Sequence, residues 1–190
     1  MTDTEPPITT PDEVRPWAPS KSVIAPDLVR IVFGLIWLID AALKWQPGFR
    51  RGYMSLLMGE SAGQPEWLHW WFRFWIDLQH PDVTLWAYLA AVIETGIAVA
   101  LILGFARKLT YIGAIVFSLI IWSTAEGFGG PYTGHSTDVG TAIIYALVFL
   151  ALLAFDYECG PSRLTVDRWL ERRFSWWLRL AEVRRVRANT

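Results

Sequence analysis

The sequence predicts an all-α integral membrane protein, built as a four-transmembrane-helix bundle. Of its 190 residues, 53% are hydrophobic and only 18% are charged, and the mean hydropathy is positive at +0.30. Four apolar segments approach or reach the length that crosses a bilayer at about 1.5 Å per helical residue. They cover about residues 23–45, 85–105, 109–125 and 139–155. A soluble helical bundle is the alternative, but its surface would need more charge than these segments carry.

Composition also limits what the chain can be. Residues 1–22 are polar, acidic and rich in proline, so we expect a disordered cytoplasmic tail rather than a cleaved secretory signal. The net charge of −1 argues against a generally basic nucleic-acid binder. Cys159 is the single cysteine, which excludes an internal disulfide, a CxxC redox pair and a four-cysteine iron–sulfur site.

The distribution of Lys and Arg predicts that both termini lie in the cytoplasm. Twelve of these residues fall in the N-terminal tail, in the turn between the second and third spans and after the fourth span, against four on the other side. The loops between spans one and two and between spans three and four then face outward. We expect a multi-pass protein of the inner (plasma) membrane, with its transmembrane domain at residues 23–156.

The second and third spans are joined by residues 104–108, a turn too short to do more than connect antiparallel helices. On the second span, Gly96, Ala100 and Gly104 are spaced by four. Small residues on such a stripe let a neighbouring helix approach closely in lipid. We therefore expect a compact bundle in which this stripe is a packing face.

The first outward loop contains an amphipathic segment that is too short to span. Pro65 and Pro81 bound a helix of about four turns at residues 66–80. Its polar residues fall on one stripe, and the other positions are aromatic or aliphatic, so we expect it to lie in the outer interface. The stripe consists of His69, Arg73, Asp77 and His80.

Residues 157–190 follow the last span as a cytoplasmic segment. Within them, residues 164–187 predict one amphipathic basic helix that lies on anionic lipid. Its arginines fall outside the apolar face, which consists of Val166, Trp169, Leu170, Phe174, Trp177 and Ala181.

Charged residues inside apolar spans are costly in lipid and are therefore candidate functional groups. Asp27 and Arg30 are one turn apart, and we interpret them as a structural charge pair whose Arg30 snorkels. Asp40 and Lys44 form an i, i+4 pair near the outer end of the first span. Glu94 lies well inside the second span, so it should point into the bundle, either protonated or paired with Lys44. Glu94 is either a group that transfers protons or a polar side chain that holds neighbouring helices together.

The loop between the last two spans is the most unusual segment. Four glycines and a proline between residues 126 and 138 favour a tight path with positive φ angles, although a plain turn needs only about four residues. We expect a binding or catalytic role; the alternative is a capped turn. The candidate catalytic residues here are Glu126, His135 and Asp138, to which we add Glu94. The candidate substrate-binding residues are Asp40, Lys44, Trp122, Phe128, Gly129, Gly130 and Tyr132.

No metal site is predicted, because the three histidines include no pair spaced by three or four on one helix. The sequence also contains no phosphate loop, dinucleotide fingerprint or Ser-His-Asp signature.

Three motifs in order resemble the DoxX/DoxD family of small four-span membrane proteins: VRIVFGLIWLIDAALKW at 29–45, ETGIAVALILG at 94–104, and EGFGGPY with the following TDVG at 126–140. The resemblance implies a membrane subunit similar to that of thiosulfate:quinone oxidoreductase, or a component of another redox complex. The family pattern touches Arg30, Lys44, Glu94, Glu126, Gly127, Gly129, Gly130 and Asp138.

Three functions follow as hypotheses. In the first, the chain is a subunit of a quinone-linked redox system. Trp122, Phe128 and Tyr132 would line the quinone slot, while Glu94, Glu126 or His135 would relay protons. Its electrons would come from a partner redox subunit, and a homo-oligomer is the other expected assembly. In the second, the chain is a non-catalytic membrane scaffold that docks a redox or cell-envelope partner. The third, a small-solute carrier, is the least favoured because no inverted repeat is visible.

Overall fold

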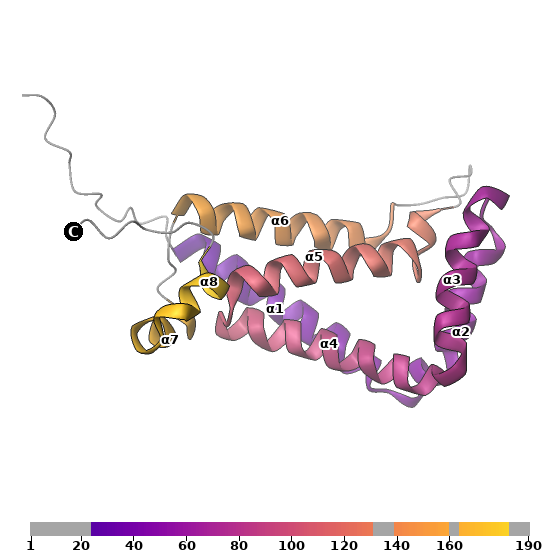
Figure 1. The fold of residues 1–190 in the computed structure, drawn as a ribbon, viewed down its shortest axis with the longest axis horizontal. Coiled ribbons are helices and arrows are strands. Elements are labelled where there is room, and N and C mark those ends of the chain that lie inside the picture. The colour runs from indigo at the N-terminus through magenta and orange to yellow at the C-terminus, as the bar shows by residue number, and fades with distance from the viewer. Residues whose placement is uncertain (1–23, 131–138, 160–163, 183–190) are drawn as a thin grey trace, which may run out of the picture.

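The computed structural model describes residues 24–130, 139–159 and 164–182, and every regular element in these ranges is a helix. Four long helices run along the molecule in alternating directions (Figure 1). They are α1 (Ile24–Lys44), α4 (Val83–Leu103), α5 (Arg107–Ser123) and α6 (Thr141–Cys159). Each coincides with a predicted apolar segment, so the predicted all-α class is confirmed. The predicted N-terminal tail lies outside the described residues.

The long helices form two pairs, α1 with α4 and α5 with α6. Gly34 allows the close approach of the first pair, because a Cβ atom there would lie 2.9 Å from both Leu101 Cβ and Ile102 Cγ1. At Gly96 a Cβ atom would meet nothing within 4 Å. Gly96 and Ala100 instead line an open groove. The prediction that these two residues form a packing face is therefore wrong.

An aromatic core joins the two pairs. Phe149 of α6 packs against Phe33 and Trp37 of α1, with ring centroids 5.0 and 5.2 Å apart. Tyr111 of α5 is buried in the same cluster. Towards the other end, α4 and α5 diverge (Figure 1). The aromatic core therefore holds one end of the bundle together and leaves room between the helices at the other.

A helical cap, residues 47–82, closes the wider end of the bundle (Figure 1). It contains α2 (Pro47–Ala62), the short helix η2 (Glu66–Leu68), α3 (His69–Gln79) and η3 (His80–Asp82). The predicted helix at 66–80 is confirmed, with a 3-10 turn at each end. Helix α2 was not predicted, because it has only one fully buried apolar residue, Leu57, to mark a face. Tertiary packing of Leu57 against Leu68 and Phe72 of the cap stabilises it.

Asp27 and Arg30 form the predicted pair, with 3.7 Å between Arg30 Nη2 and Asp27 Oδ1. The Arg30 guanidinium also donates hydrogen bonds to the carbonyls of Ile102 (3.1 Å), Leu164 (2.7 Å) and Leu101. Only 1% of Arg30 is exposed, so it does not snorkel to an interface as expected. It ties α1 to the end of α4 and to the C-terminal segment.

The predicted single C-terminal helix is wrong. The chain forms α7 (Asp167–Arg173), a 3-10 turn η5 (Ser175–Trp177) and α8 (Leu178–Ala181), with a break at Phe174, whose φ and ψ are −135° and 104°. Asp167 and Glu182 both reach Arg107. On a straight helix these two residues would be about 22 Å apart. The break is what brings both carboxylates to one guanidinium.

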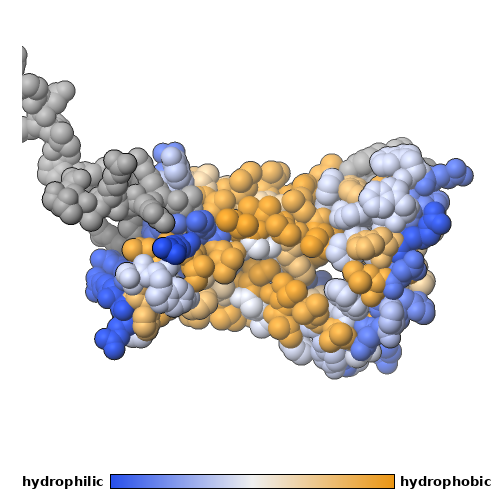
Figure 2. All heavy atoms as spheres, in the orientation of Figure 1, coloured by the Kyte–Doolittle hydropathy of each residue, from blue (hydrophilic) through white to orange (hydrophobic). Residues whose placement is uncertain are grey.

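On the face seen in Figure 2, apolar side chains form a belt across the middle of the bundle, and hydrophilic residues gather at its two ends. Within the described residues, two helical runs are long and apolar enough to cross a membrane, Glu66–Leu103 and Thr141–Glu158. Helix α5 is short, with 17 residues, and α1 carries acidic and basic residues at both ends. Exposed apolar side chains nevertheless lie on all four long helices, including Ile39, Val92, Val116 and Leu147. A belt of this kind is typical of a lipid-facing surface.

Candidate functional site

A polar chamber of about 370 Å³ lies between the four long helices at the end that the cap covers. It brings together four of the predicted site residues, Asp40, Lys44, Glu94 and Glu126, from α1, α4 and the chain after α5. The complete lining is Trp37, Asp40, Lys44, Glu94, Ser118, Ile121, Glu126, Thr141, Ala142 and Tyr145. Residues distant in sequence therefore share one cavity.

The charged groups of the chamber are held by specific contacts. Lys44 Nζ lies 3.7 Å from Glu94 Oε1, which is the pairing that the sequence left open. The Tyr145 hydroxyl donates to Asp40 Oδ2 at 3.1 Å. The Glu126 carboxylate accepts a hydrogen bond from the backbone N–H of Ala142, at 2.9 Å to Oε2. Glu126 thus binds a free N–H in the first turn of α6, where a negative charge is stabilising.

Three buried polar atoms of the chamber residues have no hydrogen-bond partner among the described residues: Trp37 Nε1, Glu94 Oε2 and Ser118 Oγ. These side chains are almost completely buried. Buried polar groups are nearly always hydrogen-bonded, to protein or to ordered water. The chamber is therefore suited to water or to a small polar molecule that offers both donors and acceptors.

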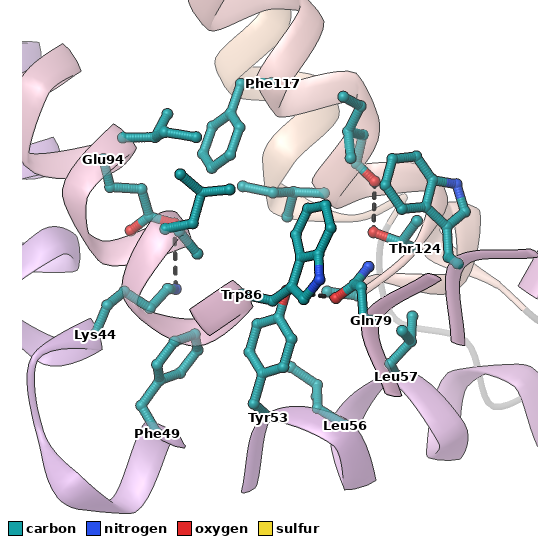
Figure 3. A pocket seen from close by; sticks show the side chains of 17 residues that line it. Lys44, Phe49, Tyr53, Leu56, Leu57, Gln79, Trp86, Glu94, Phe117 and Thr124 are labelled. Atoms are coloured by element: carbon teal, nitrogen blue, oxygen red, sulfur yellow. Dashed lines mark hydrogen bonds and ion pairs between the residues drawn. The ribbon is translucent and has the colours of Figure 1, made fainter. Parts of the chain in front are cut away.

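Next to the chamber is an apolar cavity of about 210 Å³ between α4, α5 and the cap (Figure 3). The two spaces share Lys44, Glu94 and Ile121. The other lining residues are Phe49, Tyr53, Leu56, Leu57, Trp75, Gln79, Trp86, Leu89, Ala90, Ile93, Phe117, Ile120, Thr124 and Ala125. The Lys44–Glu94 pair therefore lies in the wall between an apolar space and a polar one.

The cap contributes two hydrogen-bonding side chains to the apolar cavity, Tyr53 and Gln79. The Tyr53 hydroxyl donates to Gln79 Oε1 at 2.7 Å, beside the Trp86 ring (Figure 3). Burial raises the pKa of the Tyr53 phenol, and the negative charge of Glu94 raises it further, so the phenol stays protonated. Lys44 Nζ lies 5.1 Å from the centroid of the Phe49 ring, within cation–π range.

A third space, an open groove of about 290 Å³, runs between α4 and α5. It is lined by small and aliphatic residues: Ile93, Gly96, Ile97, Ala100, Leu109, Thr110, Gly113 and Ala114. Ile93 also lines the apolar cavity, so the two spaces adjoin. The groove therefore meets the wall of the apolar cavity at Ile93.

The glycine-rich loop has a structural role in the part that is described. Gly129 has a φ of +73°, and a Cβ atom there would lie 2.1 Å from the Val139 carbonyl oxygen. That carbonyl also accepts a hydrogen bond from Trp122 Nε1 at 2.8 Å. Gln64 of the cap donates to the carbonyl of Gly127 at 2.9 Å. The loop therefore joins α5 to α6 and docks onto the cap.

Of the predicted loop residues, Glu126 alone lines the chamber; Trp122, Phe128, Gly129 and Gly130 line neither the chamber nor the apolar cavity. Tyr132, His135 and Asp138 lie outside the described residues. Most residues of the apolar cavity were not predicted from the sequence, among them Phe49, Tyr53, Gln79 and Trp86. The i, i+4 spacing of Phe49 and Tyr53 after Pro47 was the available signal. No group of three His, Cys, Asp or Glu side chains in the described part of the chain could hold a metal.

An apolar belt, four long helices and a cavity that ends on the Lys44–Glu94 pair are together typical of a helical membrane protein. The family model DoxX matches residues 25–127, more than half of the chain, and the chain belongs to the DoxX family. The matched region includes both Lys44 and Glu94. No curated protein and no solved structure matches the chain. Membership of DoxX is thus confirmed, and the relation to thiosulfate:quinone oxidoreductase stays a prediction.

Proposed function

We propose that this DoxX protein is the membrane subunit of a quinone-linked redox system. The observation that carries the proposal is the apolar cavity whose wall contains the pair of half-buried Lys44 and buried Glu94, with 3.7 Å between Nζ and Oε1. A quinone ring needs an apolar slot with a few polar groups at its carbonyl oxygens. The slot proposed here differs from the one expected from the sequence, because Trp86, Tyr53 and Phe117 replace the loop aromatics as its walls.

Reduction of a quinone to a quinol takes up two electrons and two protons. In our proposal the Lys44 ammonium delivers one proton to a ring oxygen, and Glu94, after it takes up a proton from the polar chamber, delivers the other. Glu94 Oε2 has no hydrogen-bond partner among the described residues, which supports this role because a proton can bind there without breaking a contact. Asp40, Tyr145 and Glu126 connect the pair to the polar chamber as a route for its reprotonation. The electrons come from a partner redox subunit, since a single cysteine provides no iron–sulfur ligand set.

The chamber does not suit a thiosulfate dianion. Three carboxyl groups, Asp40, Glu94 and Glu126, line it against the single ammonium of Lys44. A thiosulfate dianion in the chamber would therefore be repelled by nearby negative charges more than it is attracted by Lys44. If thiosulfate is the electron donor, it is therefore oxidised on the partner subunit, and the present chain handles the quinone.

We further propose four spans with both termini in the cytoplasm of an inner-membrane protein. Helices α1, α4, α5 and α6 would be the spans, which places the cap and the chamber at the outer face. The apolar belt supports this arrangement (Figure 2), as does the concentration of Arg in the C-terminal segment. A ligand with a long hydrocarbon tail would reach the apolar cavity from the lipid through the groove between α4 and α5.

A scaffold that docks a redox or cell-envelope partner is the second candidate, and one observation favours it. Trp67 and Trp70 of the cap are 73% and 61% exposed, with Phe74 exposed one turn further along. Aromatic side chains on a surface are frequent anchors of protein–protein interfaces. In this case the apolar cavity would bind no quinone.

Quinone binding to the purified full-length protein separates the two candidates. Isothermal titration in detergent with a short-chain ubiquinone analogue should give one saturable site per chain. Ala90→Phe, which fills the apolar cavity, should weaken binding by at least about tenfold. The matched control is Ala42→Phe, which places the same side chain on the exposed face of α1. No saturable binding by the folded wild-type protein would favour the scaffold.

A further inference from the structure

Arg107, at the start of α5, gathers four carboxylates at the end of the bundle opposite the cap. Its Nε lies 3.2 Å from Asp167 Oδ2 and its Nη2 2.6 Å from Glu182 Oε1. Glu171 lies 3.9 Å from Nη2, and Asp156 contacts Nη1. Asp167 also accepts hydrogen bonds from the backbone N–H groups of Ala106 and Arg107 and from Trp177 Nε1. Arg107 is 2% exposed, so this is a buried cluster.

Because of this cluster, the acidic and basic side chains of the C-terminal segment, residues 164–182, lie on opposite sides of it. All three acidic side chains of the segment, Asp167, Glu171 and Glu182, face Arg107. The arginines of the segment are all exposed: Arg168, Arg172, Arg173 and Arg179. Within the described ranges none of these four arginines forms an ion pair. The segment contains both acidic and basic residues, but the charged side chains on its outer surface are all arginines.

Large apolar side chains share that outer surface. Trp169 and Trp176 are 67% and 56% exposed, and Phe174 and Leu178 are exposed beside them. The neighbouring Trp177 is turned inward and packs on Phe105, with ring centroids 5.0 Å apart. The segment adjoins the apolar belt at the end of the bundle (Figures 1 and 2). Exposed Trp beside exposed Arg at this level fits the boundary between acyl chains and phosphate groups.

We propose that the outer surface of residues 164–182 binds anionic phospholipids of the adjoining leaflet, with the four arginines contacting lipid phosphates and the exposed tryptophans inserted beside them. Arg107 is a positioning residue that keeps the carboxylates away from this surface. From the sequence we expected lipid contact through one continuous helix. The structure assigns it to two short helices with a break at Phe174 between them. The proposal does not depend on the proposed redox function.

Native mass spectrometry of the full-length protein in detergent tests this proposal. Titration with phosphatidylglycerol should give more retained lipid than titration with phosphatidylcholine of the same acyl chains. The double variant Arg172→Gln/Arg173→Gln should lower phosphatidylglycerol retention by about tenfold or more and leave phosphatidylcholine retention unchanged. The matched control, Arg51→Gln/Arg73→Gln, removes two exposed positive charges from the cap and should retain phosphatidylglycerol as the wild type does.

Two further experiments test whether the ligand is a whole phospholipid or free phosphate. Inorganic phosphate alone should not displace phosphatidylglycerol, because the lipid also binds through its acyl chains beside Trp169 and Trp176. Trp169→Ala/Trp176→Ala should lower retention of both lipids. Equal retention of the two lipids by the wild type, equal loss in the cap control, or full displacement by phosphate would each overturn the proposal. Thermal unfolding of each variant, within a few degrees of wild type, ensures that folded proteins are compared.

Discussion

Lys44 and Glu94 are 50 positions apart in the sequence and on different helices, yet Lys44 Nζ lies 3.7 Å from Glu94 Oε1 in the wall between a polar chamber and an apolar cavity. Glu94 is 4% exposed and its second carboxyl oxygen has no partner among the described residues. A fully satisfied structural ion pair would leave no such atom. Substitutions of Glu94 therefore best distinguish a role in proton transfer from a role in helix packing.

Glu94→Gln keeps the size and a hydrogen-bonding amide but cannot exchange a proton. If Glu94 delivers protons, the variant should fold normally and lower quinone reduction by about 100-fold or more, measured as quinol formation in membranes that contain the partner subunit. Glu66→Gln, an exposed change in the cap, should leave the rate unaltered. Full activity in Glu94→Gln, together with unfolding in Glu94→Leu, would instead assign Glu94 to interhelical contact.

Gly113→Leu should block the groove between α4 and α5 without harming the fold. A Cβ atom at Gly113 would meet nothing within 4 Å, and leucine is the better helix former. We expect a severalfold higher KM for a long-tailed quinone and an unchanged KM for a short-chain analogue. The matched variant is Gly59→Leu, at an equally open glycine in α2. An equal effect on both quinones would mean that tails do not pass through the groove.

Gly129→Ala should be among the more damaging small substitutions in the chain. The φ of +73° and the Val139 carbonyl oxygen 2.1 Å from the new Cβ atom leave no room for a side chain. We expect a loss of about 2 kcal/mol or more in the free energy of unfolding. Gly59→Ala, in the open middle of α2, should instead stabilise by about 0.5–1 kcal/mol. Chemical denaturation of both variants in the same detergent measures the difference, and equal stabilities would show that the loop is not tightly packed.

The C-terminal segment should loosen as pH rises through neutrality. Burial, and then the negative charge of Glu182, raise the pKa of the Glu171 carboxyl group from 4.5 to about 7, against the lowering effect of Arg107. The folded segment binds this proton more tightly than the unfolded chain does. Its stabilising effect is therefore complete below pH 4.5 and is lost as pH rises through about 7. Asp156 and Asp167 also face this cluster.

Hydrogen exchange of residues 164–182 between pH 5 and pH 8, corrected for the intrinsic exchange rate, measures this effect. Protection should fall with pH in the wild type, and Glu171→Gln should weaken the dependence. An exposed control, Glu66→Gln, should keep it. Protection that is constant with pH in the wild type would contradict the prediction.

Reporter fusions test the proposed orientation. A reporter fused after Thr190 should be active only in the cytoplasm, and one inserted near Ser61 in the cap should be active only outside. The opposite pattern would invert the bundle and place the chamber on the cytoplasmic side.

Apolar patterning was sufficient to locate α1, α4, α5 and α6 to within a few residues, because transfer into lipid acts on each residue of a span whatever its partners are. For the same reason the sequence alone identified Lys44, Glu94 and Asp40 as unusual, since a charge in an apolar run is costly in any arrangement of helices. It also determined that Asp27 and Arg30 pair, because that contact is made within one helical turn.

The partners of those charges were decided by tertiary structure. Helix α1 packs on α4 because Gly34 permits close approach, and this pairing brings Lys44 to Glu94. The break at Phe174 accompanies long-range contacts to Arg107, which no local sequence pattern predicts. Helix α2 has too few buried apolar residues to be recognised alone, yet it forms one wall of the apolar cavity. Contacts between distant segments depend on how helices pack, and helix packing is a property of the whole chain rather than of any window along it.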